Sequence, residues 1–241
     1  MPLAVLPAIT TRKPLSCERV KVNWEHPLNT RMILWFVLNE GSGQTVHTIC
    51  GSRNATGFTG GISWLNGRRG GSLDFDGTGY IDLPDSDTCI VNALTLSVWG
   101  KRNTITGAAG VLFATSNFQS TWVYENGNIA VGDAGSGWGK IDSIWTDKTA
   151  YHHLVCVVPA VGDSISVLLY FDGVYQGTVP SVRWTGVIQY PTIGIWRSHT
   201  AAWMWNGQIS EISLWGRVLS SVEVYELYSH PYGTPDNPRL I

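Results

Sequence analysis

Tryptophan side chains are the groups in this sequence best suited to binding chemistry. The 241 residues include 12 tryptophans, a high number that indicates large aromatic cores or exposed stacking surfaces. Trp138 lies in the glycine-rich stretch GDAGSGWGK, which we interpret as a loop. In IWRSHTAAWMWNG, Trp203 and Trp205 share a face if the segment is extended, and Trp196 precedes the intervening polar loop. Exposed tryptophans stack on sugar rings or anchor protein contacts, whereas others pack at the edge of a core. These alternatives stay open.

Candidate catalytic groups are few and scattered. The glutamates stand apart from one another, and no nucleophile elbow, zinc motif or phosphate-binding loop is present. Retaining glycosidases need two carboxylates about 5 Å apart, and Asp74 and Asp76 share a strand face but precede a turn. The adjacent His152 and His153 point to opposite faces of a strand, so we expect one buried, hydrogen-bonded histidine and one exposed histidine. The sequence predicts a protein that is not an enzyme.

Composition excludes several classes of function. Hydrophobic residues make up 44% of the chain and charged residues 14%, which is typical of a globular protein. The net charge of −2 and the pI near 6.3 give no basic surface for nucleic acid or anionic membranes. No apolar segment approaches the ~18 residues of a membrane helix. We therefore expect neither nucleic acid nor membrane as a partner.

The start of the chain and the cysteines indicate where the protein is made. The first apolar run is short, is broken by prolines and lacks a basic leader, so it does not resemble a secretory signal. The four cysteines are too sparse for a disulfide scaffold. We expect Cys156, in the apolar run HLVCVV, to be a buried free thiol, and pairing among Cys17, Cys50 and Cys89 stays open. Synthesis in a reducing cytoplasm fits these features.

Turn signals divide the chain into short strands. Asn-Gly and Asp-Gly steps favour hairpin turns because both central residues take positive φ. These steps are Asn66-Gly67, Asp76-Gly77, Asn126-Gly127, Asp172-Gly173 and Asn206-Gly207. Alternating apolar runs flank them, at 72–77, 80–84, 94–102, 110–115, 121–132, 151–159, 164–179, 191–196 and 207–217. Short strands at fairly regular spacing, with almost no helical periodicity, predict an antiparallel sandwich or barrel.

One helix is predicted near the end of the chain. Ser220-x-x-Glu223 is a capping-box pattern. Val222, Tyr225 and Tyr228 then recur at helical spacing, and a proline stops the run. We expect a short helix that packs onto an edge of the sandwich.

The termini differ from the rest of the chain. Residues 1–30 are rich in proline and basic residues and lack repeated turns, which predicts an extended N-terminal arm that packs on a neighbour or along the domain's own surface. Residues 231–241 form a proline-rich C-terminal tail. A single domain over residues 31–230 lies between them.

Six segments, taken in order, resemble the laminin-G-like branch of the concanavalin-A-like lectin/glucanase superfamily. The resemblance covers roughly residues 32–230 and rests on 34–46, 67–86, 94–102, 151–158, 168–179 and 205–228. It implies an all-β, two-sheet antiparallel jelly-roll sandwich with one short C-terminal helix. It also implies that YFDG, with Asp172 and Gly173, is a hairpin turn between neighbouring strands. Members of the superfamily bind sugars, mediate adhesion or hydrolyse glycans, and fold alone does not choose among these activities.

The resemblance implies a calcium site as well. Members often hold calcium at the sandwich rim with oxygen ligands, and Asp74, Asp76 and Glu211 occupy matching segments. The usual Ile-Asp-Glu has Ser210 at its centre here, which weakens that reading. We favour solvated, outward-facing carboxylates over a metal site and expect no cofactor, with calcium as the alternative.

Residues 12–31 are similar to the lead-in of laminin-G-like proteins encoded in bacteriophage genomes. This resemblance implies a non-catalytic virion surface protein, either a capsid decoration or tail-associated, that acts through protein contacts. The arm with Trp24 and the loop tryptophans would make those contacts with a capsid or tail protein, within a homo-oligomer such as a trimer. The alternative is a carbohydrate-binding lectin module that stacks glycans on tryptophan, with or without calcium.

Overall fold

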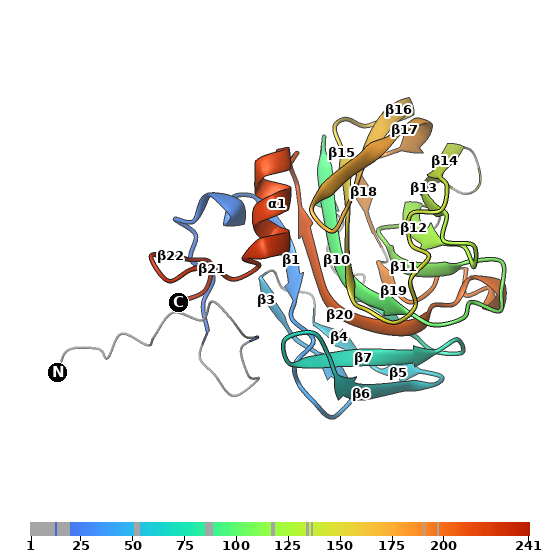
Figure 1. The fold of residues 1–241 in the computed structure, drawn as a ribbon, viewed down its shortest axis with the longest axis horizontal. Helices are drawn as coiled ribbons and strands as arrows, with labels where there is room; N and C mark the ends of the chain where they lie inside the picture. Colours follow the sequence, from blue (N-terminus) through green and yellow to red (C-terminus); the bar gives the residue numbers. More distant parts are fainter. Residues whose placement is uncertain are drawn as a thin grey trace.

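The computed structural model describes residues 13, 20–50, 54–84, 89–116, 119–133, 135, 137–189, 191–196 and 198–241. Two antiparallel sheets face each other, and a helix lies with the described chain ends on the outer side of one of them (Figure 1). The predicted jelly-roll sandwich with a short helix near the C terminus is confirmed. Cys17 lies outside the described residues.

The larger sheet has nine strands. Seven follow one another in space as β17 (Val174–Trp184), β16 (Gly162–Phe171), β15 (His152–Val158), β10 (Leu94–Arg102), β20 (Asn206–Trp215), β1 (Met32–Phe36) and β3 (Thr48–Cys50). The other two are β7 (Gly71–Asp76), which also pairs with β20, and its hairpin partner β6 (Ile62–Asn66).

The smaller sheet has seven strands. Their spatial order is β14 (Gly137–Ile141), β13 (Ile129–Asp133), β12 (Gln119–Val123), β11 (Gly110–Ala114), β19 (Thr192–Ile193), β8 (Tyr80–Asp82) and β5 (Phe58–Thr59). Three two-stranded ribbons complete the strands: β9 (Cys89–Ile90) with β18 (Val187–Ile188), β2 (Thr45–Val46) with β4 (Ala55–Thr56), and β21 (Gly233–Thr234) with β22 (Asn237–Pro238). Short helices are η1 (Pro27–Asn29), η2 (Ala201–Trp203) and α1 (Ser221–Ser229).

The main core lies between the two sheets. Strand β10 illustrates how the sequence builds it, because Leu96 and Val98 join this core while Ser97 points the other way and pairs with His153. Alternation along a strand places successive side chains on opposite faces. Each sheet therefore has an inner face in the core and an outer face that needs its own cover.

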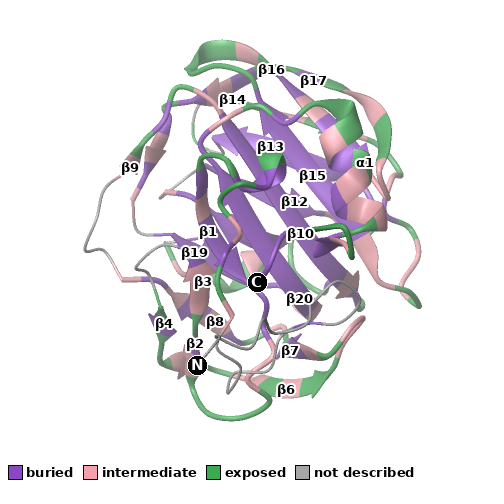
Figure 2. Ribbon diagram, turned by 90° about the vertical axis from the view of Figure 1, so that its left-hand side faces the viewer, coloured by how far each residue is buried: buried purple, intermediate pink, exposed green. Residues whose placement is uncertain are grey.

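The outer face of the nine-stranded sheet is covered by residues 20–30, residues 231–241 and α1 (Figures 1 and 2). Val22 forms an antiparallel bridge with Leu240, and the backbones of Lys21 and Ile241 exchange hydrogen bonds of 2.7 and 2.9 Å. Val22 and Leu240 are buried with the helix residue Leu227 in one apolar cluster. The described part of the predicted arm, residues 20–30, thus packs against its own chain.

Helix α1 begins where its sequence predicts, but the helix buries a different face from the predicted one. The capping box is present, with the Ser220 hydroxyl accepting from the backbone of Glu223 and the Glu223 carboxylate accepting from the backbone of Ser220. The predicted apolar stripe is wrong, because Val222 is 74% exposed. Val224 and Leu227 are buried instead, because the helix lies on the outer face of the sheet rather than on its edge.

The Asn-Gly and Asp-Gly steps take different roles. Asp172 and Gly173 have φ of 50° and 77° and form the hairpin turn between β16 and β17, as predicted. Asn206-Gly207 is not a turn, because both residues lie inside β20. A Cβ on Gly207 would lie 2.3 Å from the backbone oxygen of Lys101, so this glycine permits a close approach of strands.

The described cysteines are free. Cys156 is buried, as predicted, and burial raises the pKa of its thiol to about 12. Cys50 and Cys89 are also unpaired. Within the described ranges, no helix is long and apolar enough to cross a membrane.

Candidate functional site

Four tryptophans gather on the outer face of the seven-stranded sheet and define what we call the tryptophan face: Trp122, Trp138, Trp196 and Trp203. Trp122 is at the centre, on β12, and is 1% exposed. Its ring centroid lies 5.5 to 6.2 Å from those of the other three. Edge and tilted contacts of this kind stabilise aromatic clusters, so the cluster is a rigid surface.

Trp138 is the most exposed member of the tryptophan face. It lies on strand β14 and not in the loop that its glycine-rich surroundings indicate, and it is 44% exposed. Its strand partner is Gly132, where a Cβ would lie 2.9 Å from the Cα of Trp138. The absent side chain at Gly132 lets the two strands approach and leaves the indole beside Trp122.

Trp196 and Trp203 form the other side of the tryptophan face. Their rings stack with centroids 4.1 Å apart and planes 25° apart. The indole nitrogen of Trp196 donates to the Ser120 hydroxyl on β12, which fixes the pair to the sheet. Trp196 is buried, and Trp203 is partly exposed.

Trp205 does not join this cluster. The expectation that Trp203 and Trp205 share a face is wrong, because η2 ends at Trp203 and breaks the extended alternation. Trp205 turns into the main core, is 0% exposed and lies 5.7 Å from Trp145. It cannot contact a partner directly.

Trp24 lies apart from the tryptophan face. It is 57% exposed and belongs to the N-terminal segment, whose neighbour Asn23 bonds to Arg239 and Pro238 on the other outer face. It is therefore an isolated exposed aromatic residue.

A polar group borders β8 of the seven-stranded sheet. His199 stacks on Tyr80 with ring centroids 4.5 Å apart, and its Nε2 lies 3.0 Å from the Asp82 carboxylate. His199 follows Trp196 in the same loop, and its backbone donates to the Trp196 carbonyl. The loop that carries Trp196 and Trp203 is thus anchored to β12 through Trp196 and to β8 through His199.

The three candidate metal ligands do not form a site. Asp76 accepts from the backbone and hydroxyl of Thr78, and Asp74 interacts with Gln208, while burial raises the pKa of Asp74. Glu211 is 6% exposed. In the part of the chain that the structure describes, no three His, Cys, Asp or Glu residues are placed to hold a metal ion.

Glu211 belongs instead to a buried polar network beneath the chain ends. Its two oxygens accept from the indole of Trp35 at 2.8 Å and the hydroxyl of Tyr232 at 2.9 Å. Arg239 stacks 4.1 Å above the Trp35 ring and donates to Asn29. Burial lowers the pKa of Arg239 to about 10, and the charge of Glu211 opposes this shift. Both oxygens of Glu211 therefore have donors, whereas Nη2 of Arg239 is buried without a hydrogen-bond partner. Removing one member of such a buried charged group destabilises the fold.

The two histidines of the doublet point to opposite faces, as predicted, but the expectation that one of them is exposed is wrong. His153 is buried beneath α1, with its Nε2 2.7 Å from the Ser97 hydroxyl. His152 points the other way, between Asp172 at 2.7 Å and Asp147 at 3.0 Å, and its side chain is only 15% exposed. The hydrogen bond to Asp172 is the main cause that raises the pKa of His152.

The sequence predictions did not include Trp122, which lies at the centre of the cluster. A signal was available, because Ser120 and Trp122 alternate with Thr121 and Val123 on β12, and a tryptophan on the polar phase of a strand indicates an aromatic outer face.

Comparison with known proteins identifies the family. A model of the concanavalin A-like lectin/glucanases superfamily, of laminin G type, matches residues 75–225. The chain belongs to this superfamily. A search of curated proteins finds no match to the sequence.

Several solved structures share the fold of this chain. One is domain 4 of AbnA, a GH43 extracellular arabinanase from Geobacillus stearothermophilus, in complex with arabinotriose. It has a TM-score of 0.56 and 18% identity over 82% of this chain and 99% of that one. For the binding domain of botulinum neurotoxin DC in complex with SialylT, the TM-score is 0.59 and the sequence identity is 12%. The match covers 84% of this chain and 52% of that one. For the binding domain of Paraclostridial Mosquitocidal Protein 1, the TM-score is 0.61 and the sequence identity is 13%. The match covers 83% of this chain and 52% of that one. The chain thus spans about half of the two toxin domains.

Proposed function

We propose that this protein is a non-catalytic carbohydrate-binding protein that holds glycans on its tryptophan face. The main observation behind this proposal is that Trp138 is 44% exposed while its ring packs against the buried Trp122. The face is preorganised, so a ligand does not have to order it on binding. Trp203 extends the aromatic surface beyond Trp122.

Sugar rings suit this surface. A flat, rigid indole offers apolar area to the C–H face of a sugar, and polar groups at the border supply hydrogen bonds. Ser198 and Thr200 are partly or fully exposed in the loop that carries Trp196 and Trp203. These hydroxyls can donate to and accept from the hydroxyls of a glycan.

Two comparisons support the proposal without deciding it. Domain 4 of the arabinanase is in complex with arabinotriose, and one toxin binding domain is in complex with SialylT. Each is thus a ligand-bound domain with the same fold as this chain.

The absence of catalysis is part of the proposal. The carboxylates that the sequence singles out, Asp74, Asp76 and Glu211, belong to β7 and β20 of the other sheet. Glycoside hydrolysis needs two carboxylates on opposite sides of the scissile bond. We expect no turnover on any glycan that the protein binds.

A glycan array that includes arabinotriose and sialylated oligosaccharides tests the proposal. We expect the wild type to bind at least one glycan and Trp138→Ala to lose that binding. Trp24→Ala is the matched control, because Trp24 is exposed outside the tryptophan face. An array on which Trp138→Ala and the wild type bind alike would contradict the proposal.

The setting on a phage virion is a separate proposal, and it rests on the resemblance of residues 12–31. It predicts a homo-oligomer held by the start of the chain, which light scattering measures as solution mass. The truncation should remove only residues 1–12, because the buried Lys13 donates to Gly71 and Ser210. An oligomer that dissociates on truncation supports this setting, and a monomer in both forms contradicts it.

A further inference from the structure

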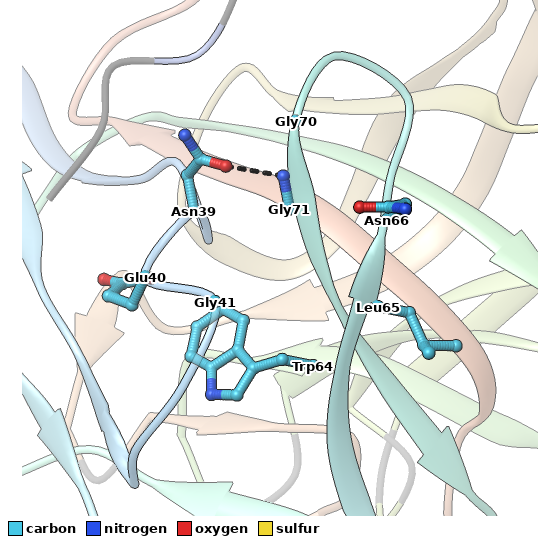
Figure 3. Close-up of a pocket in the computed structure, with 8 residues that line it drawn as sticks. All are labelled: Asn39, Glu40, Gly41, Trp64, Leu65, Asn66, Gly70 and Gly71. Atoms are coloured by element: carbon cyan, nitrogen blue, oxygen red, sulfur yellow. Dashed lines mark hydrogen bonds between the residues drawn. The ribbon is translucent and has the colours of Figure 1, made fainter.

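A hollow lies between the chain that follows β1 and the β6–β7 hairpin (Figure 3). It encloses about 530 Å³, and a smaller hollow of about 220 Å³ adjoins it at Glu40, which lines both. This size is in the range of small-molecule sites. The residues that matter for its chemistry are Asn39, Glu40, Trp64, Asn66, Gly70 and Gly71.

Hydrogen bonds fix the walls of the hollow. The Asn39 side chain accepts from the backbone of Gly71 at 2.5 Å, and the Trp64 indole donates to the Gly43 carbonyl at 2.9 Å. A Cβ at Gly70 would lie 2.7 Å from the Asn39 side-chain oxygen. The glycines therefore let the hairpin approach Asn39 and leave no side chain to fill the space.

Three residues that line this hollow, Trp64, Asn66 and Glu40, carry groups suited to a ligand. The ring of Trp64 lies between Gly41 and β6, with its broad face visible in Figure 3. The exposed Asn66 amide has no hydrogen-bond partner in the described structure. Glu40 is 9% exposed at its side chain, and one carboxylate oxygen accepts from the backbone of His47 at 2.7 Å. The other oxygen, Oε2, is buried without a donor, which is costly for a carboxylate.

The charges around Glu40 favour a neutral ligand. Within the described residues no three ligating side chains are placed for a metal ion, so Glu40 lacks the partners that a divalent cation needs. Its carboxylate disfavours anions. Lys13 is near enough for the charge of Glu40 to raise its pKa, although burial dominates and lowers the pKa of Lys13 to about 7.

We propose that this hollow is a second binding site, for one ring of a neutral saccharide or a similar polyol. The ring stacks on Trp64, and its hydroxyls bond to the Asn66 amide and donate to Oε2 of Glu40. Because Oε2 is buried, the Glu40 side chain rotates towards the ligand as it binds. The site is independent of the tryptophan face.

The test is a titration of the full chain with arabinotriose and with maltotriose at millimolar concentrations. The readout is the indole N–H signal of Trp64 in nuclear magnetic resonance spectra, assigned with Trp64→Phe. We expect this signal to move in the wild type and equally in Trp138→Ala. Asn66→Ala and Glu40→Gln should each weaken the binding about tenfold.

Glu25→Gln is the matched control, because it makes the same change of charge at an exposed residue outside the hollow. It should leave the titration unchanged. A Trp64 signal that does not move with either sugar overturns this inference, as does movement that Asn66→Ala and Glu40→Gln leave intact. If the Trp138 signal moves and the Trp64 signal does not, the proposed function stands and this second site fails.

Discussion

The outer faces of the two sheets both carry tryptophans, but they differ in how far other parts of the chain cover them. Each carries tryptophans, with Trp35 and Trp215 on the nine-stranded sheet and Trp122 and Trp138 on the seven-stranded sheet. On the larger sheet, α1 and both chain ends cover the aromatic residues. On the smaller sheet, Trp196 and Trp203 pack beside the aromatic residues, and Trp138 stays 44% exposed.

The difference separates stability from recognition. The covered face buries charged groups, such as Arg239 and Glu211, inside a network of hydrogen bonds. The tryptophan face offers indole rings to the surroundings. Substitutions on the covered face should therefore change the free energy of unfolding, and substitutions on the tryptophan face should change binding.

The largest effect is expected on the covered face, from Arg239→Ala. Arg239 is 0% exposed, donates to Asn29 and lies over Trp35, so its loss leaves Glu211 as a buried charge with one fewer neighbour. We expect a loss of about 3–5 kcal/mol in the free energy of unfolding, measured by urea denaturation. Lys21→Ala, at an exposed residue of the same layer, should cost less than about 0.5 kcal/mol. Equal effects of the two substitutions would contradict a stabilising role of the buried network around Arg239.

Trp138→Ala should behave in the opposite way. Because the ring is nearly half exposed, we expect a change of about 1 kcal/mol or less in unfolding free energy. Its affinity for the best glycan should fall about tenfold or more, as for an exposed aromatic anchor, measured by calorimetric titration. A large loss of stability with unchanged affinity would assign Trp138 to the scaffold.

Acid should act on the covered face through His153. Burial, and to a smaller extent the charge of nearby Arg68, lower the pKa of His153 to about 3. The unfolded chain, with a pKa of 6.5, then binds a proton that the folded chain does not. This contribution is complete above pH 6.5 and is lost as the pH falls towards 3. Between pH 6 and pH 5, the stability of the wild type relative to His153→Gln should fall by about 1 kcal/mol.

His152 should give a smaller effect of opposite sign. Its pKa is raised, mainly by the hydrogen bond to Asp172. Its contribution to stability is therefore complete below pH 6.5 and is lost as the pH rises through the folded pKa. The difference in melting temperature between the wild type and His152→Gln, measured from pH 6 to pH 9, should therefore shrink as the pH rises (about three pH units span the transition). A difference that grows with rising pH would show the wrong sign.

Local patterns carried the sequence predictions that succeeded. Strand alternation, the Asp172-Gly173 turn and the capping box at Ser220 and Glu223 depend on neighbouring residues, so they are legible in the sequence. The family resemblance supplied the two-sheet order.

Predictions that depend on distant contacts failed or were absent. Trp205 faces the core because η2 ends two residues before it, and nothing in the local pattern indicates that turn. The pairing of Val22 with Leu240 joins opposite ends of the chain. The sequence made Glu211 a candidate metal ligand, but in the fold its carboxylate oxygens accept hydrogen bonds from the distant residues Trp35 and Tyr232.

The most direct test of the central claim is the position of a bound glycan in a crystal of the complex. The ligand is the best binder from the array, and the protein is the full chain. The account predicts a sugar ring against the exposed indole of Trp138 or Trp203, with the covered face unchanged. A glycan bound over α1 or the chain ends, with the tryptophan face empty, would contradict it.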